Sequence, residues 1–320
     1  MKYDKPPTTI DQQIAILKQR KLVIDDNVRA AKYLNSIGYY RLTGYMYHLQ
    51  EGKEHFFNGK VTFNDIIDTY NFDKKLRYLI GSYIERIEVA MRSLLTNTFS
   101  LTQGFYWYAD SQHYTRIEIP EHIKKESAEG KPLPRKYNDT HEYIYKSIKE
   151  NFNNSSERFI ANFKRVYTSE PIPPSNMAME IISMGKISKL YEALKNSPEK
   201  KQVADTFNLP HTILSSWLIY LTNIRNICAH HSRLWNRKTT ADRFAIPQKK
   251  SLSFNGKQED DFNTSMYGTV SVMLRLLNAI NPENSFEAKL KGLLNEYPKI
   301  NPSDMGFPVG WENKPAWKPI

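Results

Sequence analysis

The sequence holds one cysteine, Cys228, among 320 residues. A single thiol excludes a disulfide within the chain and any zinc site built from several cysteines. Six of the eight histidines, all except His230 and His231, show no metal-ligand spacing with one another or with a pair of carboxylates. Glycine-rich phosphate loops and a nucleophile elbow are also missing. We therefore expect no metal and no cofactor, and neither NTPase nor serine-hydrolase chemistry.

Long hydrophobic runs are absent as well. The most apolar window, TVSVMLRLLNAI, is broken by Arg275, and a membrane-spanning helix needs about 18 or more apolar residues. The first residues, MKYDKPPTTIDQQ, lack the apolar segment of a secretion signal. We expect a cytoplasmic protein that has no membrane partner.

Acidic residues are in the minority. Lys and Arg number 45 against 34 Asp and Glu, which gives a formal net charge of +11. A balance of this size favours polyanionic partners. The excess is concentrated between Arg225 and Lys250, where seven basic residues accompany one acidic residue, Asp242. Because guanidinium groups bind phosphate oxygens bidentately, we expect this segment to bind a phosphate that balances its charge.

Helical periodicity predicts a mainly α fold. The apolar positions Ile80, Ile84, Ile87, Met91 and Leu94 are spaced by four or three residues, as on one face of a helix. Earlier in the chain we expect one helix that carries Ile10, Ile14 and Leu17, after a Thr9–Gln12 capping box, and a second that ends at Ile37 before Gly38. The remaining helices are expected from Thr62 onward and over 141–167, 176–196, 199–207, 211–235, 261–280 and 284–296.

The chain divides into three parts by pattern. Residues 1–60 form an N-terminal module of two helices and an aromatic-rich hairpin, winged-helix-like, that could contact nucleic acid. Residues 61–300 form the helical body, in which 101–140 interrupts the periodicity and is expected to be an insertion or long loop. Residues 301–320 hold four prolines and three large aromatics, and we expect a tail docked on the body.

The segment IRNICAHHSRLWNR, residues 224–237, carries the main candidate site. On a helical wheel one arc is apolar, and the other collects Arg225, Asn226, His230, Arg233 and Arg237. His231 falls on the apolar arc beside residues 224, 227 and 228. We therefore expect a buried or half-buried His231 that supports the site, and a reactive His230 on the polar side.

An arginine and a histidine separated by four residues suit RNA cleavage without metal. A histidine has the right pKa to move protons near neutrality, and an arginine stabilises the charge that develops on the phosphorane. Arg225 and His230 would lie about 140° apart on an ideal helix. A two-fold axis between two copies of the helix would bring both residues of each copy onto one phosphate, so we expect a homodimer.

Further candidates surround this segment. Arg233, Arg237 and Lys238 are expected to contact the RNA backbone. Arg41 and Tyr40 are further candidates for RNA binding. They belong to a tyrosine-rich stretch whose rings either fill a small core or stack on unpaired bases. Glu88 and Arg92 have the i,i+4 spacing of an intrahelical salt bridge. The alternative for this pair is a supporting network that orients Arg225 or His230.

The segment LTNIRNICAHHSRLWNR resembles the signature of the Abi-like family, the AbiD/AbiF type of abortive-infection proteins within the HEPN ribonuclease superfamily. Four further blocks of the chain resemble the family in order: KPPTTIDQQIAILKQRKLVIDD, YLNSIGYYRLTGY, FDKKLRYLI with IERIEVAMRS, and MGFPVGWENKPAW. The resemblance implies an all-α HEPN-type helical bundle and a homodimer with a composite active site. It also implies a metal-independent endoribonuclease used in phage defence or as a toxin, which leaves 2′,3′-cyclic phosphate or 3′-phosphate ends. A structured small RNA that restrains the enzyme is a further implied partner.

Two other functions stay open at this point. A non-catalytic RNA-binding protein could use the same basic groove, and it would bind RNA in a salt-sensitive way without cleaving it. A DNA-binding regulator that acts through residues 1–60 would need duplex affinity from that module alone. The presence of both Arg225 and His230 favours the nuclease, because binding alone would tolerate lysine or glutamine at the histidine.

Overall fold

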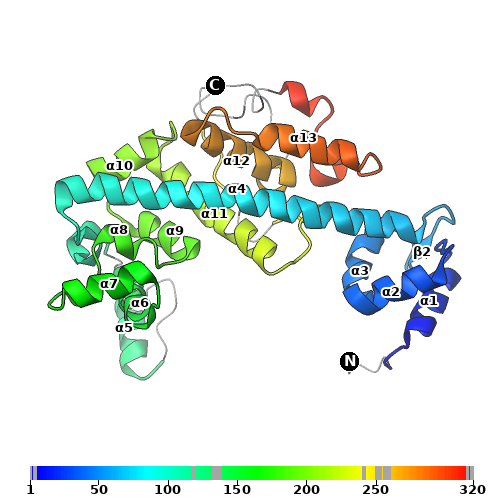
Figure 1. Cartoon of the computed structure of the whole chain (residues 1–320), viewed down its shortest axis with the longest axis horizontal. Coiled ribbons are helices and arrows are strands. Elements are labelled where there is room, and N and C mark those ends of the chain that lie inside the picture. Colours follow the sequence, from blue (N-terminus) through cyan, green and yellow to red (C-terminus); the bar gives the residue numbers. More distant parts are fainter. Residues whose placement is uncertain are drawn as a thin grey trace.

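One long helix, α4 (Phe63–Gln103), crosses the molecule from end to end, and the other elements are arranged around it (Figure 1). The computed structural model describes residues 2, 6–116, 118, 120–131, 139–239, 243–248, 254, 261–314 and 317. At 1.5 Å per residue, 41 residues give a rod of about 60 Å. Thr62 and Asp65 form a capping box at its start, and Gly104, with φ of 80°, ends it. The predicted apolar seam is buried along this rod from Ile80 to Met91, and its last member, Leu94, is half-buried.

The first part of the chain packs at the amino-terminal end of α4 (Figure 1). It comprises α1 (Ile10–Gln19), α2 (Asn27–Ile37), α3 (Tyr39–Met46) and a hairpin of β1 (Gln50–Glu51) with β2 (Phe56–Phe57). The capping box at Thr9 and the stop at Gly38 are as predicted. The hairpin predicted in the aromatic-rich stretch is present at residues 50–57, but the start of that stretch, from Tyr39, is a helix, because Leu42, Tyr45 and Met46 bury one of its faces.

Helices from the middle of the chain gather at the opposite end of α4, most of them below it in the view, whereas α10 lies above it (Figure 1). After two short 3-10 turns (Trp107–Ala109 and Ser111–His113) they are α5 (Glu121–Ala128), α6 (Thr140–Asn154), α7 (Arg158–Val166), α8 (Ser175–Ala178), α9 (Met184–Ala193), α10 (Pro198–Asp205) and α11 (His211–Ala229). The single helix predicted over 176–196 is divided, since the chain turns between α8 and α9. Of the interruption predicted at 101–140, residues 117, 119 and 132–138 lie outside the described residues.

The last helices cover the other side of α4 (Figure 1). A 3-10 turn (Phe262–Thr264) leads into α12 (Met266–Ile280), which is followed by α13 (Phe286–Glu296); both helices pack on α4. Beyond them, two 3-10 turns (Pro302–Met305 and Trp311–Asn313) carry the tail, whose Phe307, Trp311 and Trp317 are buried. Residues 315–316 and 318–320 of the predicted tail are outside the described part of the chain. The fold is mainly α, as predicted, and no helix of the described residues has the length and apolarity needed to cross a membrane.

Candidate functional site

The end of α11 differs from the prediction and sets the geometry of the site. The helix stops at Ala229, not at residue 235, because His231 has a left-handed backbone with φ of 55°. The amide of Ser232 donates to the carbonyl of Ile227 at 3.0 Å, and that of His231 donates to Cys228 at 3.1 Å. These two bonds form a Schellman motif, which usually places glycine at the left-handed position. A histidine there is uncommon, and such backbone conformations are concentrated at functional sites.

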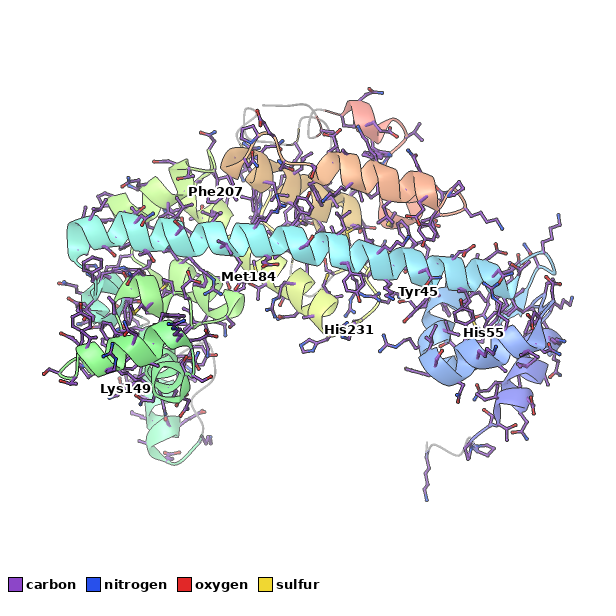
Figure 2. All side chains as sticks on the ribbon, in the orientation of Figure 1. Tyr45, His55, Lys149, Met184, Phe207 and His231 are labelled. Atoms are coloured by element: carbon purple, nitrogen blue, oxygen red, sulfur yellow. The ribbon has the colours of Figure 1, made fainter. Side chains whose placement is uncertain are left out.

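The change of backbone direction exposes both histidines. Arg225, His230 and His231 are exposed and Asn226 is half-buried. The expected burial of His231 is therefore wrong: its side chain leaves the apolar arc of the wheel because the helix has already ended. Figure 2 shows His231 at the free end of α11, facing the open space beneath α4.

A cleft of about 610 Å³ lies between α4, α3 and the end of α11. Arg225 and His231 line it, whereas His230 does not. The two histidines are thus separated, as the wheel predicted, but His231 is the one that shares a cavity with Arg225. The other residues that line the cleft are Arg41, Tyr70, Lys74, Arg77, Tyr78, Gly81, Ser82, Glu85, Glu88, Cys228 and Ala229.

The cleft is rich in positive charge. Arg41, Lys74 and Arg225 are exposed side chains on its walls. Among the described residues none of the three forms an ion pair with a carboxylate. Unpaired cations that converge on a concave surface attract anions and raise their local concentration. This arrangement fits a phosphate-bearing ligand.

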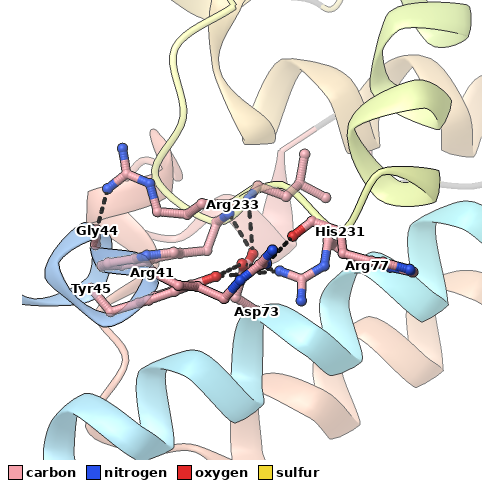
Figure 3. Close-up of polar contacts among 9 residues, drawn as sticks. Arg41, Gly44, Tyr45, Asp73, Arg77, His231 and Arg233 are labelled. Atoms are coloured by element: carbon pink, nitrogen blue, oxygen red, sulfur yellow. Dashed lines mark hydrogen bonds and ion pairs between the residues drawn. The ribbon is translucent and has the colours of Figure 1, made fainter. Parts of the chain in front are cut away.

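A buried carboxylate holds the loop that follows α11 (Figure 3). Asp73 of α4 is fully buried, and its Oδ1 accepts hydrogen bonds from the amides of Leu234 at 3.0 Å and Trp235 at 2.8 Å. Its Oδ2 accepts from the hydroxyl of Tyr45 at 2.6 Å and pairs with Arg77, one helical turn away. The loop amides would otherwise be without partners, so this carboxylate determines where residues 230–235 lie.

Two arginines join the same loop to the N-terminal helices (Figure 3). Arg41 of α3 donates to the carbonyl oxygen of His231 at 2.6 Å. In return, Arg233 of the loop donates to the carbonyl oxygen of Gly44 in α3 at 2.7 Å. Hydrogen bonds from charged donors are about twice as strong as neutral ones. Both residues are predicted to contact RNA; what the structure shows is that each holds the backbone beside the histidines.

The electrostatics of the network follow from burial. Burial raises the pKa of Asp73 above that of a free aspartate, while Arg77 and the hydrogen bonds from Tyr45 and the two amides oppose the change. Burial alone would lower the pKa of Arg77, but the carboxylate of Asp73 raises it overall. Burial also raises the pKa of Cys228 to about 12. A thiol with that pKa stays protonated near neutrality and is a poor nucleophile.

The matched region of the chain includes this whole network. A family model described as Abi-like protein matches residues 32–236, which is more than half of the 320 residues. The chain belongs to the Abi-like protein family. Searches of curated proteins and of solved structures returned no match.

Of the other residues predicted to act in this Abi-like chain, Glu88 lines the cleft, whereas Arg92, Arg237, Lys238 and Tyr40 do not. Glu88 and Arg92 form the predicted intrahelical ion pair, and Arg92 also donates to the carbonyl oxygen of Met179. Glu88 lines the cleft that contains Arg225, so the pair also lies beside the site. Arg237 is exposed, Lys238 pairs with Asp261 at 2.5 Å, and Tyr40 is 91% exposed. Within the described residues, no three His, Cys, Asp or Glu side chains gather as a metal site would require.

The network that positions the loop is not predicted by the sequence pattern. In the sequence, Asp73 and Arg77 stand out only as part of a block that resembles the family, although both precede Ile80 on the buried face of α4. Charged side chains on an apolar helix face are costly unless they are paired, so an Asp–Arg pair at i,i+4 on that face was a usable signal. No sequence signal identifies the partners of this pair, because they are distant in sequence: they are Tyr45 and the amides of residues 234 and 235.

Proposed function

We propose that this Abi-like protein is a metal-independent endoribonuclease that acts in phage defence by abortive infection, or as a toxin. The observation that carries the proposal is the exposed Arg225, which shares a cationic cleft with His231 at the end of α11. Membership of the Abi-like family supports the role in abortive infection. The HEPN fold and the AbiD/AbiF type are part of the proposal and rest on the sequence resemblance.

The proposed chemistry uses only side chains. A histidine takes the proton of the ribose 2′-hydroxyl or gives one to the departing 5′-oxygen, and Arg225 stabilises the phosphorane between these steps. Asn226, half-buried beside Arg225, positions the phosphate or holds the arginine. Cleavage by this route leaves 2′,3′-cyclic phosphate or 3′-phosphate ends.

The proposed site is composite. In one protomer the cleft contains Arg225 and His231 but not His230. We assign proton transfer to His230, as the sequence motif suggests, and that assignment requires a second protomer to bring its His230 to the phosphate. The exposure of all three side chains permits such a pairing. Arg237, Lys238 and Tyr40 would then contact the RNA on either side of the scissile linkage.

The decisive measurement is cleavage of single-stranded RNA by the full chain in the presence of EDTA. We expect Arg225→Ala and His230→Ala each to reduce the rate at least about 100-fold, the usual contribution of an acid–base or charge-stabilising group. His231→Ala, measured beside them, establishes which histidine transfers the proton. His122→Ala on α5 and Arg158→Ala on α7 are matched controls, because both side chains are exposed and distant in sequence from the site.

The same variants test the role in cells. Expression of the intact chain in bacteria should slow growth, and Arg225→Ala should relieve it. Full RNA cleavage by His230→Ala would refute the assignment of that residue. Tight, salt-sensitive RNA binding with no product at any enzyme concentration would instead show the non-catalytic RNA-binding protein.

A further inference from the structure

One carboxylate in the cleft has no role in the chemistry proposed above. Glu85 of α4 is exposed, lines the cleft and has no hydrogen-bond or ion-pair partner among the described residues. Its neighbour Glu88 differs, because Arg92 neutralises it. Glu85 is therefore a free negative charge inside a cleft whose walls carry Arg41, Lys74 and Arg225.

A free carboxylate in a phosphate-binding cleft divides it electrostatically. Like charges repel, so the phosphate is disfavoured beside Glu85 of α4 and favoured beside Arg225 of α11 and the neighbouring His231. Glu85 then faces whatever part of the ligand carries N–H donors, since an ionised carboxylate only accepts hydrogen bonds. In a nucleotide the part that carries such donors is the base.

Glu85 belongs to a stripe suited to a base. Tyr78, Ser82 and Glu85 are spaced by four and three residues on α4, so they lie on one face of the helix, and all three line the cleft. Tyr78 is 65% exposed, which leaves its ring free to stack on an unpaired base. The rise of the helix places Glu85 about 10 Å beyond Tyr78.

We propose that this stripe recognises guanine next to the scissile phosphate, so that the substrate is single-stranded RNA cut beside guanosine. The proposal rests on the ribonuclease function proposed above. Guanine presents two adjacent N–H donors, N1–H and the 2-amino group, and a carboxylate accepts both at once. Adenine and cytosine each offer one amino group beside a ring acceptor, and uracil places its single N–H between two carbonyl oxygens. Only guanine therefore satisfies both carboxylate oxygens.

The test measures base preference in two ways. Binding of guanosine 3′-monophosphate and adenosine 3′-monophosphate to the full chain is compared by calorimetry, and cleavage is compared on oligouridine that carries one guanosine, inosine or adenosine. We expect the guanosine ligand to bind at least about 10-fold more tightly, the usual discrimination of a good bidentate pair. Inosine, which lacks the 2-amino group, should fall between the two.

Three variants decide the role of the stripe. Glu85→Gln replaces one acceptor with a donor and should abolish the guanosine preference while adenosine 3′-monophosphate binds as before. Tyr78→Ala should weaken both nucleotides about equally, by about 10-fold. Glu150→Gln, at an exposed position of α6, should change nothing. A guanosine preference that survives Glu85→Gln overturns the proposal.

The outcome separates this inference from the function on which it rests. Cleavage without a guanosine preference supports the ribonuclease function and refutes the role of Glu85 in base recognition. Binding that prefers guanosine and depends on Glu85, without any cleavage, supports the base recognition and refutes the nuclease.

Discussion

The contribution of Asp73 can be tested by the substitution Asp73→Asn. The side chain keeps its shape but loses the charge that neutralises Arg77, whose own side chain is only 7% exposed. Breaking a buried ion pair by removing one partner costs about 3–5 kcal/mol, because the remaining charge stays buried without compensation. The asparagine oxygen can still accept from the amides of Leu234 and Trp235, so we expect the lower end, a loss of about 3 kcal/mol in the free energy of unfolding.

Urea denaturation monitored by tryptophan fluorescence measures this change. The double variant Asp73→Asn/Arg77→Met removes both charges, and we expect it to be more stable than Asp73→Asn alone. Asp68→Asn, five residues earlier on the same helix and exposed, is the matched control and should stay within about 0.5 kcal/mol of the native chain.

The same variant separates positioning from stability. At a temperature where Asp73→Asn is fully folded, RNA cleavage should still fall by about 10-fold or more, because misplacing a reactive group by a small distance is costly. If Asp73→Asn has the same urea midpoint of unfolding as the native chain, or cleaves RNA at the native rate while it is folded, Asp73 does not hold the histidine loop in place.

Three further predictions concern other parts of the molecule. Burial lowers the pKa of His48 below its ordinary value of 6.5, although Asp304 opposes this. The unfolded chain therefore binds a proton more readily than the folded chain, and the free energy of unfolding falls as the pH drops below about 6.5. His48→Phe should therefore reduce the difference between the urea midpoints measured at about pH 7.5 and about pH 5.5. Hydrogen bonds from Gln103 and Thr102, each 2.9 Å long, hold the pKa of Glu199 at about 2. The ionised carboxylate therefore stabilises the fold above the ordinary pKa of 4.5, and this stabilisation is lost as the pH falls towards about 2. Glu199→Gln should lower the free energy of unfolding by about 1 kcal/mol at neutral pH and make it depend less on pH between about 4.5 and about 2. Trp311→Ala, at a buried position in the tail, should lower the free energy of unfolding by about 3–5 kcal/mol in the same denaturation assay, whereas Val309→Ala, at a position 99% exposed, should leave it unchanged.

The helices with clear apolar periodicity could be predicted from the sequence. The seam of α4 and the starts and stops at Thr9 and Gly38 are local features, and each carries its own physical signal. The helix α3 was missed because its tyrosines are typical of strands, while the burial of Leu42 and Tyr45 that makes it a helix depends on the surface of α4. Aromatic residues have a preference that tertiary packing overrides.

The motif residues were found from the sequence, but their geometry was not. The apolar arc continues through Leu234 and Trp235, and both residues are buried, so the pattern alone extends the helix past its true end. What ends the helix is a left-handed histidine, and what holds the chain afterwards is a carboxylate more than 150 positions earlier in the sequence. Neither effect leaves a periodic signal, since one is a property of the backbone and the other a long-range contact.

The crossed arginine bonds mean that the beginning and the end of the matched region are physically one unit. That region opens at Lys32, within α2, the helix that precedes the one carrying Arg41, and closes at Asn236, directly after the tryptophan whose amide donates to Asp73. Removing the first sixty residues would therefore strip two arginine–carbonyl hydrogen bonds from the histidine loop, and the hydrogen bond of the Tyr45 hydroxyl from Asp73. Any partner that pulls on those early helices acts directly on the backbone next to the histidines.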